Sequence, residues 1–140
     1  SITSKYPRLF IASKSILPCN LGVVLRFFKV AYPYDPPPIT VFSLIFKDCF
    51  DLVYTLQSMH DIGGEEAISK IYQACAKLIA PGGWLMVADF VVTEEAFDPD
   101  KPGRLPIAWH LGALSDAGFS AAVCSLETGK LACMVGDMPD

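Results

Sequence analysis

Charged residues and long apolar runs are both scarce in this chain of 140 residues. Charged residues make up 19% of the sequence and hydrophobic residues 52%, a composition too apolar for a disordered chain. The most apolar stretch, Leu21 to Tyr32, is interrupted by Arg26 and Lys29. No run reaches the roughly 18 apolar residues that a membrane-spanning helix needs. The sequence therefore predicts one domain with its own core and no membrane partner.

Cysteine and histidine are also sparse. None of the five cysteines belongs to a CxxC pair, so neither a disulfide framework nor a zinc site is indicated. His60 and His110 are the only histidines, which leaves few ligands, and no metal site is predicted. We expect buried thiols in a reducing, cytoplasmic environment.

Glycine and acidic residues are almost missing from residues 1–46, which contain only Gly22 and Asp35 of these types. The same segment holds six of the eleven prolines and carries a net charge of +4, whereas residues 47–140 carry −8. This contrast predicts two segments of different character, 1–46 and 47–140. The five basic residues of the first are scattered singly, so no nucleic-acid partner is predicted. Its residues 39–46 suit a strand.

From Phe50 onward the pattern becomes regular. Residues 50–56 form a short apolar run typical of a strand buried on both faces. Glu65 and Glu66 begin a helix whose apolar residues recur every three or four positions, and Pro81-Gly82-Gly83 ends it. Residues 84–92 form a second apolar strand.

A second helix and a hairpin follow. Ile107, Leu111, Leu114 and Gly118 mark one helical face, and residues 122–126 and 131–135 are two strands joined across Gly129. The order strand, helix, strand, helix, hairpin predicts a layered α/β sheet with right-handed crossovers that ends in a hairpin. We expect one shared core, made of Leu52, Val53, Ile71, Leu78, Leu85, Val87, Leu111 and Leu114.

Five short motifs follow one another from residue 50 onward. They are Phe50-Asp51-Leu52-Val53, Ser58-Met59-His60-Asp61, Leu78 to Gly83, the strand from Trp84, and Ala117-Gly118-Phe119. In this order they resemble the C-terminal half of class I S-adenosylmethionine-dependent methyltransferases. The resemblance covers residues 50–140 and implies a Rossmann-like sheet, in which the last strand, residues 131–135, inserts antiparallel between 84–92 and 122–126. It also implies an enzyme that binds S-adenosylmethionine and methylates a small molecule.

The glycine-rich turn and the ribose-binding acid of this family have no counterpart in residues 1–46. The resemblance therefore implies a sheet that is incomplete on its N-terminal side and a cofactor site that lacks its main anchors. A truncation, a frame-shifted start and an unrelated leader stay open as interpretations, and the nucleotide sequence upstream of Ser1 would decide between them. We expect the chain alone to bind S-adenosylmethionine weakly and to show no turnover.

Ligands of open α/β sheets bind beyond the carboxyl ends of the strands, which here places Thr55, Leu56 and Gln57 at the cofactor. Some O-methyltransferases of the family use a His-Asp pair just beyond this strand, so the resemblance implies His60 as the base and Asp61 as its partner. The alternative is that His60 is a surface turn residue and Asp61 an acid at the start of a helix. Asp89 either faces the acceptor or is a buried carboxylate bonded to backbone N–H groups, and His110 is expected to pack or cap.

Two other functions stay open on the sequence. The first is a non-catalytic Rossmann-like remnant that acts as an interaction module and pairs with another chain, or with a second copy as a homo-oligomer, through an exposed sheet edge. The second is a nicotinamide-dependent enzyme, which shares the strand-helix alternation but also needs a glycine-rich turn. Cofactor binding by the purified chain separates the first from a methyltransferase.

Overall fold

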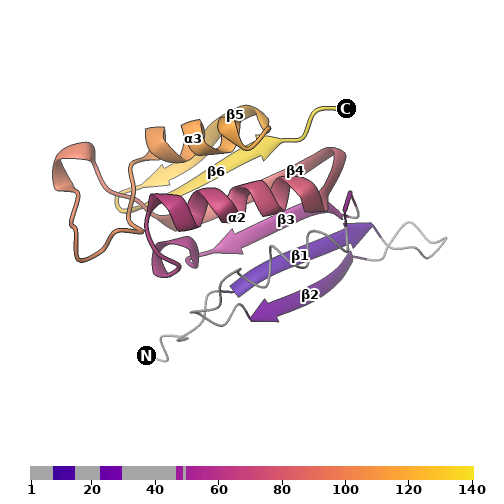
Figure 1. The fold of residues 1–140 in the computed structure, drawn as a ribbon, viewed down its shortest axis with the longest axis horizontal. Helices are drawn as coiled ribbons and strands as arrows, with labels where there is room; N and C mark the ends of the chain where they lie inside the picture. Colours follow the sequence, from indigo (N-terminus) through magenta and orange to yellow (C-terminus); the bar gives the residue numbers. More distant parts are fainter. Residues whose placement is uncertain (1–7, 15–22, 30–46, 49) are drawn as a thin grey trace.

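A mixed six-stranded sheet forms the centre of the molecule (Figure 1). The computed structural model describes residues 8–14, 23–29, 47–48 and 50–140. The strand order is β2-β1-β3-β4-β6-β5. The strands are β1 (Arg8–Lys14), β2 (Val23–Lys29), β3 (Phe50–Leu56), β4 (Ile79–Phe90), β5 (Ser120–Thr128) and β6 (Leu131–Asp137).

Two α-helices lie against the sheet, α2 (Glu65–Leu78) on β3 and β4, and α3 (Ile107–Asp116) on β5 and β6. They also contact each other, so they form one layer over one face. Single 3-10 turns η1 (Met59–Asp61) and η2 (Glu94–Ala96) follow β3 and β4. Within the described ranges, no helix has the length and apolar character needed to cross a bilayer.

The C-terminal hairpin is arranged as the sequence predicts. Strand β6 lies between β4 and β5 and pairs antiparallel with both. By contrast, β3 and β4 pair parallel, with Thr55 opposite Val87. The parallel pair requires a crossover, which α2 provides, and the order strand, helix, strand, helix, hairpin is confirmed.

The open edge expected beside β3 is not observed. A sheet incomplete on that side would leave β3 near an open edge, but β1 pairs antiparallel with β3 and with β2. The described edge strands are therefore β2 and β5. The alternating pattern that reveals a half-buried strand is weak in both N-terminal runs, so neither was predicted as a strand. Residues 39–46 lie outside the described residues, and the division between residues 46 and 47 stays a prediction.

Helix α2 ends earlier than predicted. Its last residue is Leu78, and Ile79 already has extended backbone angles, φ −85° and ψ 129°. Pro81-Gly82-Gly83 instead forms an irregular start to β4, where a side chain on Gly83 would collide with the carbonyl oxygen of Asp51. Gly82 N–H donates to Met138 and Met138 N–H donates to Gly83, at 3.0 and 2.8 Å. The glycines thus allow the chain to enter the sheet rather than stop the helix.

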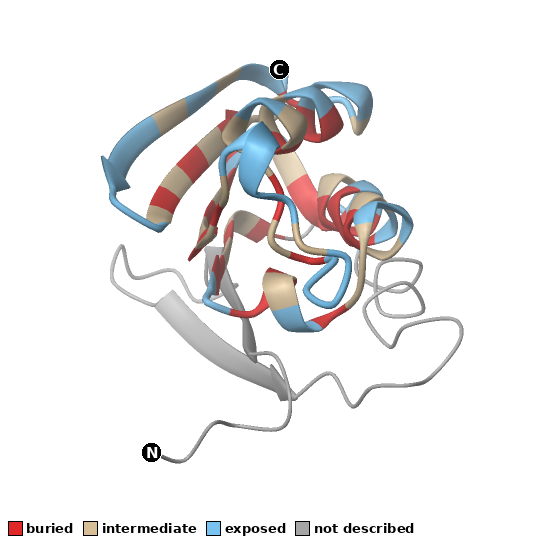
Figure 2. Ribbon diagram, turned by 90° about the vertical axis from the view of Figure 1, so that its left-hand side faces the viewer, coloured by how far each residue is buried: buried red, intermediate tan, exposed pale blue. Residues whose placement is uncertain are grey.

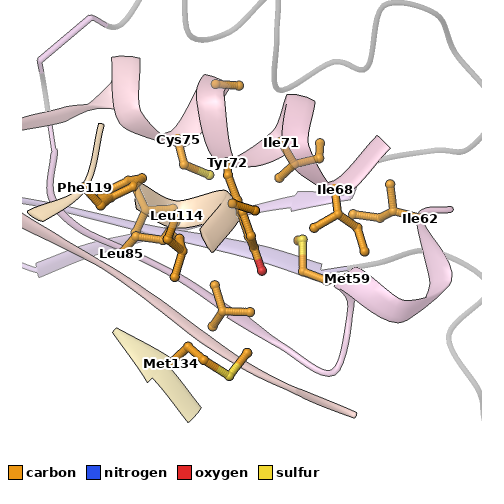
Figure 3. Close-up of a cluster of buried hydrophobic side chains, with 14 of the residues drawn as sticks. Met59, Ile62, Ile68, Ile71, Tyr72, Cys75, Leu85, Leu114, Phe119 and Met134 are labelled. Carbon is orange, nitrogen blue, oxygen red and sulfur yellow. The ribbon is translucent and has the colours of Figure 1, made fainter. Parts of the chain in front are cut away.

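The core lies between the sheet and the two helices (Figures 2 and 3). Six of the eight residues expected there are fully buried, and Figure 3 shows Ile71, Leu85 and Leu114 among them. Leu111 is half-buried at the edge of this core. Leu52 was assigned wrongly. It pairs with Trp84 on the opposite face of the sheet, because its neighbour Val53 is the residue that points to the helices.

That opposite face, called here the open face, is apolar. The alternation along each strand places on it four of the five large hydrophobic side chains that are exposed, namely Leu56, Trp84, Val123 and Leu126. No described helix covers this face. Sheets containing parallel strands are commonly covered on both faces, so the open face is unusual.

Candidate functional site

The candidate site lies where β3 and β4 end side by side. Leu56 pairs with Ala88, and Gln57 N–H donates to the Ala88 carbonyl at 2.7 Å. Gln57 then takes a left-handed conformation, φ 49°, which turns the chain out of the sheet. Non-glycine residues seldom adopt this conformation outside turns and functional sites. The turn starts η1, the segment that carries His60.

Asp89, near the end of β4, holds this turn in place. Its Oδ2 accepts hydrogen bonds from the backbone N–H groups of Ser58, at 2.9 Å, and Met59, at 2.6 Å. No side-chain cap comes from Ser58 itself, so Asp89 satisfies the free N–H groups at the start of η1. Asp89 is 1% exposed. Of its two predicted roles, the buried carboxylate bonded to backbone N–H groups is the one observed.

Asp89 also orients His60. Its Oδ1 lies 2.6 Å from His60 Nδ1, and the His60 side chain is only 12% exposed. A carboxylate can only accept, so Nδ1 carries the hydrogen and Nε2 of the neutral ring keeps a free electron pair. Asp61, the predicted partner, has Oδ1 3.3 Å from Nε2. Asp89 therefore fixes the tautomer of the ring, and Asp61 can accept a hydrogen bond from Nε2 once Nε2 is protonated.

The surroundings of His60 favour its charged form. Burial lowers the pKa of His60, but the hydrogen bond to Asp89 and the Asp89 charge raise it. Asp61 raises it further, Arg104 lowers it, and the net result is a pKa above 6.5. The ring is also held edge-on against Phe90, with centroids 4.8 Å apart. His60 is thus a fixed proton acceptor at the end of a parallel strand pair.

The three predicted cofactor residues separate in the structure. Leu56, 46% exposed, and Gln57 line a cavity of about 460 Å³ that Asp89 and the β5–β6 hairpin also line. Thr55 points to the helix side and is 1% exposed. Its hydroxyl has no hydrogen-bond partner among the described residues. The cavity therefore includes Leu56 and Gln57 but not Thr55, and the cofactor role of all three stays a prediction.

His110 is a buried packing residue, as expected. It is fully buried, its Nδ1 lies 2.7 Å from the Tyr72 hydroxyl, and no described residue bonds to its Nε2. Burial lowers the pKa of His110 to about 4, although Asp89 opposes the shift. Burial raises the pKa of Tyr72, with smaller contributions from Asp89 and Cys75. The pair is neutral at pH 7 and lies in the core beside the carboxylate that holds His60.

Comparison with known proteins finds likeness in structure but not in sequence. No protein-family model and no curated protein matches the chain. Among solved structures, PigF with SAH (S-adenosylhomocysteine) has a TM-score of 0.53 at 18% identity, over 64% of this chain and 30% of that one. An O-methyltransferase family protein from Burkholderia thailandensis has a TM-score of 0.56 at 17% identity, over 69% of this chain and 33% of that one. Human N-acetylserotonin methyltransferase with S-adenosylmethionine has a TM-score of 0.55 at 15% identity, over 65% of this chain and 30% of that one.

The chain is related in fold to class I S-adenosylmethionine-dependent methyltransferases. It has part of their Rossmann-like sheet, as the sequence motifs predict. It spans about a third of the length of the methyltransferases that it matches. The likeness concerns the fold, and the roles of individual residues follow from the local geometry instead.

Proposed function

We propose that this chain forms part of an enzyme that transfers a methyl group from S-adenosylmethionine to a small-molecule hydroxyl in the cytoplasm. The observation that carries the proposal is the His60–Asp89 pair at the carboxyl ends of β3 and β4, the place where open α/β sheets bind their ligands. Asp89 fixes the position of the imidazole, and its neutral form has a free nitrogen that suits removal of a proton from a hydroxyl. The three described cysteines are free thiols, which is compatible with a reducing compartment.

The residues present fit one wall of a cofactor site. Leu56 and Gln57 would line it, at a cavity with a largely apolar surface. The sequence has no glycine-rich turn that would bring backbone N–H groups to the methionine carboxylate. When bound, S-adenosylmethionine supplies an electrophilic methyl carbon on a sulfonium. The chain's own contribution is then to position the acceptor and take its proton.

The geometry supports His60 as the acceptor of the proton. Asp89 holds Nδ1–H, so Nε2 would take the O–H proton of the acceptor. The acceptor oxygen would bond to the methyl carbon in place of its bond to sulfur, and S-adenosylhomocysteine would leave with that electron pair. The new Nε2–H can donate to Asp61, whose Oδ1 is 3.3 Å away. The two carboxylates together stabilise the imidazolium, which agrees with the raised pKa of His60. Base catalysis of this kind contributes about 10²–10⁴ in rate.

Titration of the ¹⁵N-labelled chain with S-adenosylhomocysteine tests the proposal. Each missing hydrogen bond to a charged group removes about 1.5–3 kcal/mol, so we expect a dissociation constant in the millimolar range. The amide shifts should map to Leu56, Gln57 and Ala88. NAD is the control ligand and should leave these amides unchanged. Shifts confined to other residues, or equal shifts with NAD, would contradict the proposal.

The open face supports a second candidate, a non-catalytic interaction module that pairs with a second copy of the chain. Exposure of Leu56, Trp84, Val123 and Leu126 on one face is the observation that favours it. Sedimentation equilibrium should then show a dimer that Leu126→Ser weakens, whereas Phe97→Ser, on an exposed turn outside the sheet, leaves it intact. A monomer at high micromolar concentration would exclude this function.

A further inference from the structure

The loop after β4 is docked tightly on the turn that carries His60. Gly103 is buried, and a side chain there would collide with the backbone carbonyl oxygens of His60 and Gly63. A Cβ on Gly64 would lie 3.5 Å from the side chain of Pro102. Because two backbone segments touch at this point, the residue that follows Gly103 has a fixed position relative to His60.

That residue is Arg104. Its N–H donates to the Lys101 carbonyl at 3.1 Å, and the next residue, Leu105, forms a parallel bridge with Val91. The guanidinium carbon of Arg104 lies 5.0 Å from the centroid of the Phe90 ring, a cation–π distance. Phe90 contacts the His60 ring in turn. Phe90 therefore lies between the guanidinium and the proposed base and contacts both.

Arg104 has no acidic partner among the described residues. It is half-buried, yet no described carboxylate lies within ion-pair distance of it, and no described acceptor bonds to its side chain. It lines two cavities, one of about 400 Å³ that His60 and Asp61 also line, and one of about 570 Å³ toward the β5–β6 turn. A guanidinium offers five N–H donors in a planar fork that matches a carboxylate.

We propose that Arg104 binds a carboxylate of the methyl acceptor and so holds its hydroxyl beside His60. This inference rests on the proposed function and names its substrate class, a hydroxy acid. Asp61 and Asp100 line the same cavity, so charge alone does not attract an anion there. The paired N–H donors of Arg104 select a carboxylate over neutral groups, which cannot accept two charge-assisted hydrogen bonds.

The carboxylate is assigned to the acceptor rather than to the methionine part of the cofactor. The cavity lined by Leu56 and Gln57 shares no residue with either cavity that Arg104 lines. Asp89 lines the first cavity and His60 the one beside Arg104. Asp89 and His60 are hydrogen-bonded to each other, so the expected cofactor cavity and the acceptor cavity adjoin at this pair.

The test is a titration of the ¹⁵N-labelled chain at pH 8 with 4-hydroxybenzoate and with its neutral analogue 4-hydroxybenzamide. We expect shifts at Gly63 and at the Arg104 side chain, with the acid binding at least about tenfold more tightly than the amide. Arg104→Gln should abolish this preference. Lys101→Gln, which removes an exposed cation from the same cavity, should keep most of it. Arg104→Lys keeps the charge but not the planar set of N–H donors, so its preference for the acid should lie between those of Arg104→Gln and Lys101→Gln.

Equal affinity for acid and amide in the parent chain, or a preference that survives Arg104→Gln, would overturn the proposal. Free methionine supplies the cofactor's carboxylate as a separate probe. Shifts at Arg104 with methionine but not with 4-hydroxybenzoate would assign the guanidinium to the cofactor and also refute it. If S-adenosylhomocysteine fails to bind while the acid still binds at Arg104, the methyltransferase proposal fails and the carboxylate site stands.

Discussion

His110 should make the folded chain sensitive to mild acid. Its pKa is about 4 in the folded protein and 6.5 in the unfolded chain. Between these values the unfolded state binds more protons, so the free energy of unfolding falls as the pH drops from 6.5 toward 4. The loss attributable to His110 is about 2 kcal/mol at pH 5 and approaches about 3 kcal/mol below pH 4.

The matched variants are His110→Phe and the double variant His110→Phe/Tyr72→Phe. The single variant leaves the buried Tyr72 hydroxyl without its partner, which costs about 1–3 kcal/mol at pH 7. The double variant removes both polar groups and should recover most of that loss. Both variants lack the buried imidazole, so both should lose less stability than the parent between pH 7 and pH 5.

Urea unfolding followed by circular dichroism at pH 7, 6 and 5 measures these changes. We expect the parent to lose about 2 kcal/mol more than the double variant over this range. Parallel curves for the two proteins would show that His110 is not buried as a neutral ring. They would also remove the polar pair from the description of the core.

Three further predictions concern stability. Gly103→Ala should destabilise the chain by about 1–3 kcal/mol because the added Cβ meets backbone oxygens. Gly112→Ala, which has open space around it in α3, should stabilise the chain by up to about 1 kcal/mol. Equal effects of the two substitutions would refute the close contact between the loop and the turn that carries His60. Ile71→Ala should lower the free energy of unfolding, measured in urea, by about 2–5 kcal/mol. Leu111→Ala should lower it clearly less, because Leu111 is only half-buried. The reverse order would mean that the buried faces of the helices are assigned wrongly. The raised pKa of His60 contributes stability that is present below pH 6.5 and lost as pH rises through the folded pKa. His60→Asn should therefore flatten the decline in the free energy of unfolding above pH 6.5. An unchanged dependence of this free energy on pH would contradict the ion pair with Asp89.

The sequence predicts well those helices and strands in which apolar residues recur at a regular spacing. The spacing of Ile68, Ile71 and Cys75 identifies α2 because a helix needs only local contacts to show its face. The hairpin likewise follows from two short runs and one glycine turn. The insertion of β6 between β4 and β5 came from the resemblance to methyltransferases.

The features that the sequence does not reveal depend on contacts between distant residues. Asp89 lies 29 positions after His60, and only the parallel register of β3 and β4 brings them together. Asp61 is adjacent to His60 and was therefore the obvious partner. Gly103 and Arg104 lie in a polar loop that shows no period, so their closeness to His60 has no local signal.

The central claim is that Asp89 holds His60 with its Nδ1 protonated and its Nε2 free to accept a proton. Long-range ¹H–¹⁵N correlation spectra of the His60 ring, recorded across a pH titration, test it directly. We expect the Nδ1–H tautomer at high pH and a pKa above 6.5 in the parent chain. Asp89→Asn should lower the pKa below 6.5, because burial and Arg104 then outweigh Asp61. A neutral ring protonated mainly at Nε2, or a pKa that Asp89→Asn leaves unchanged, would contradict the claim.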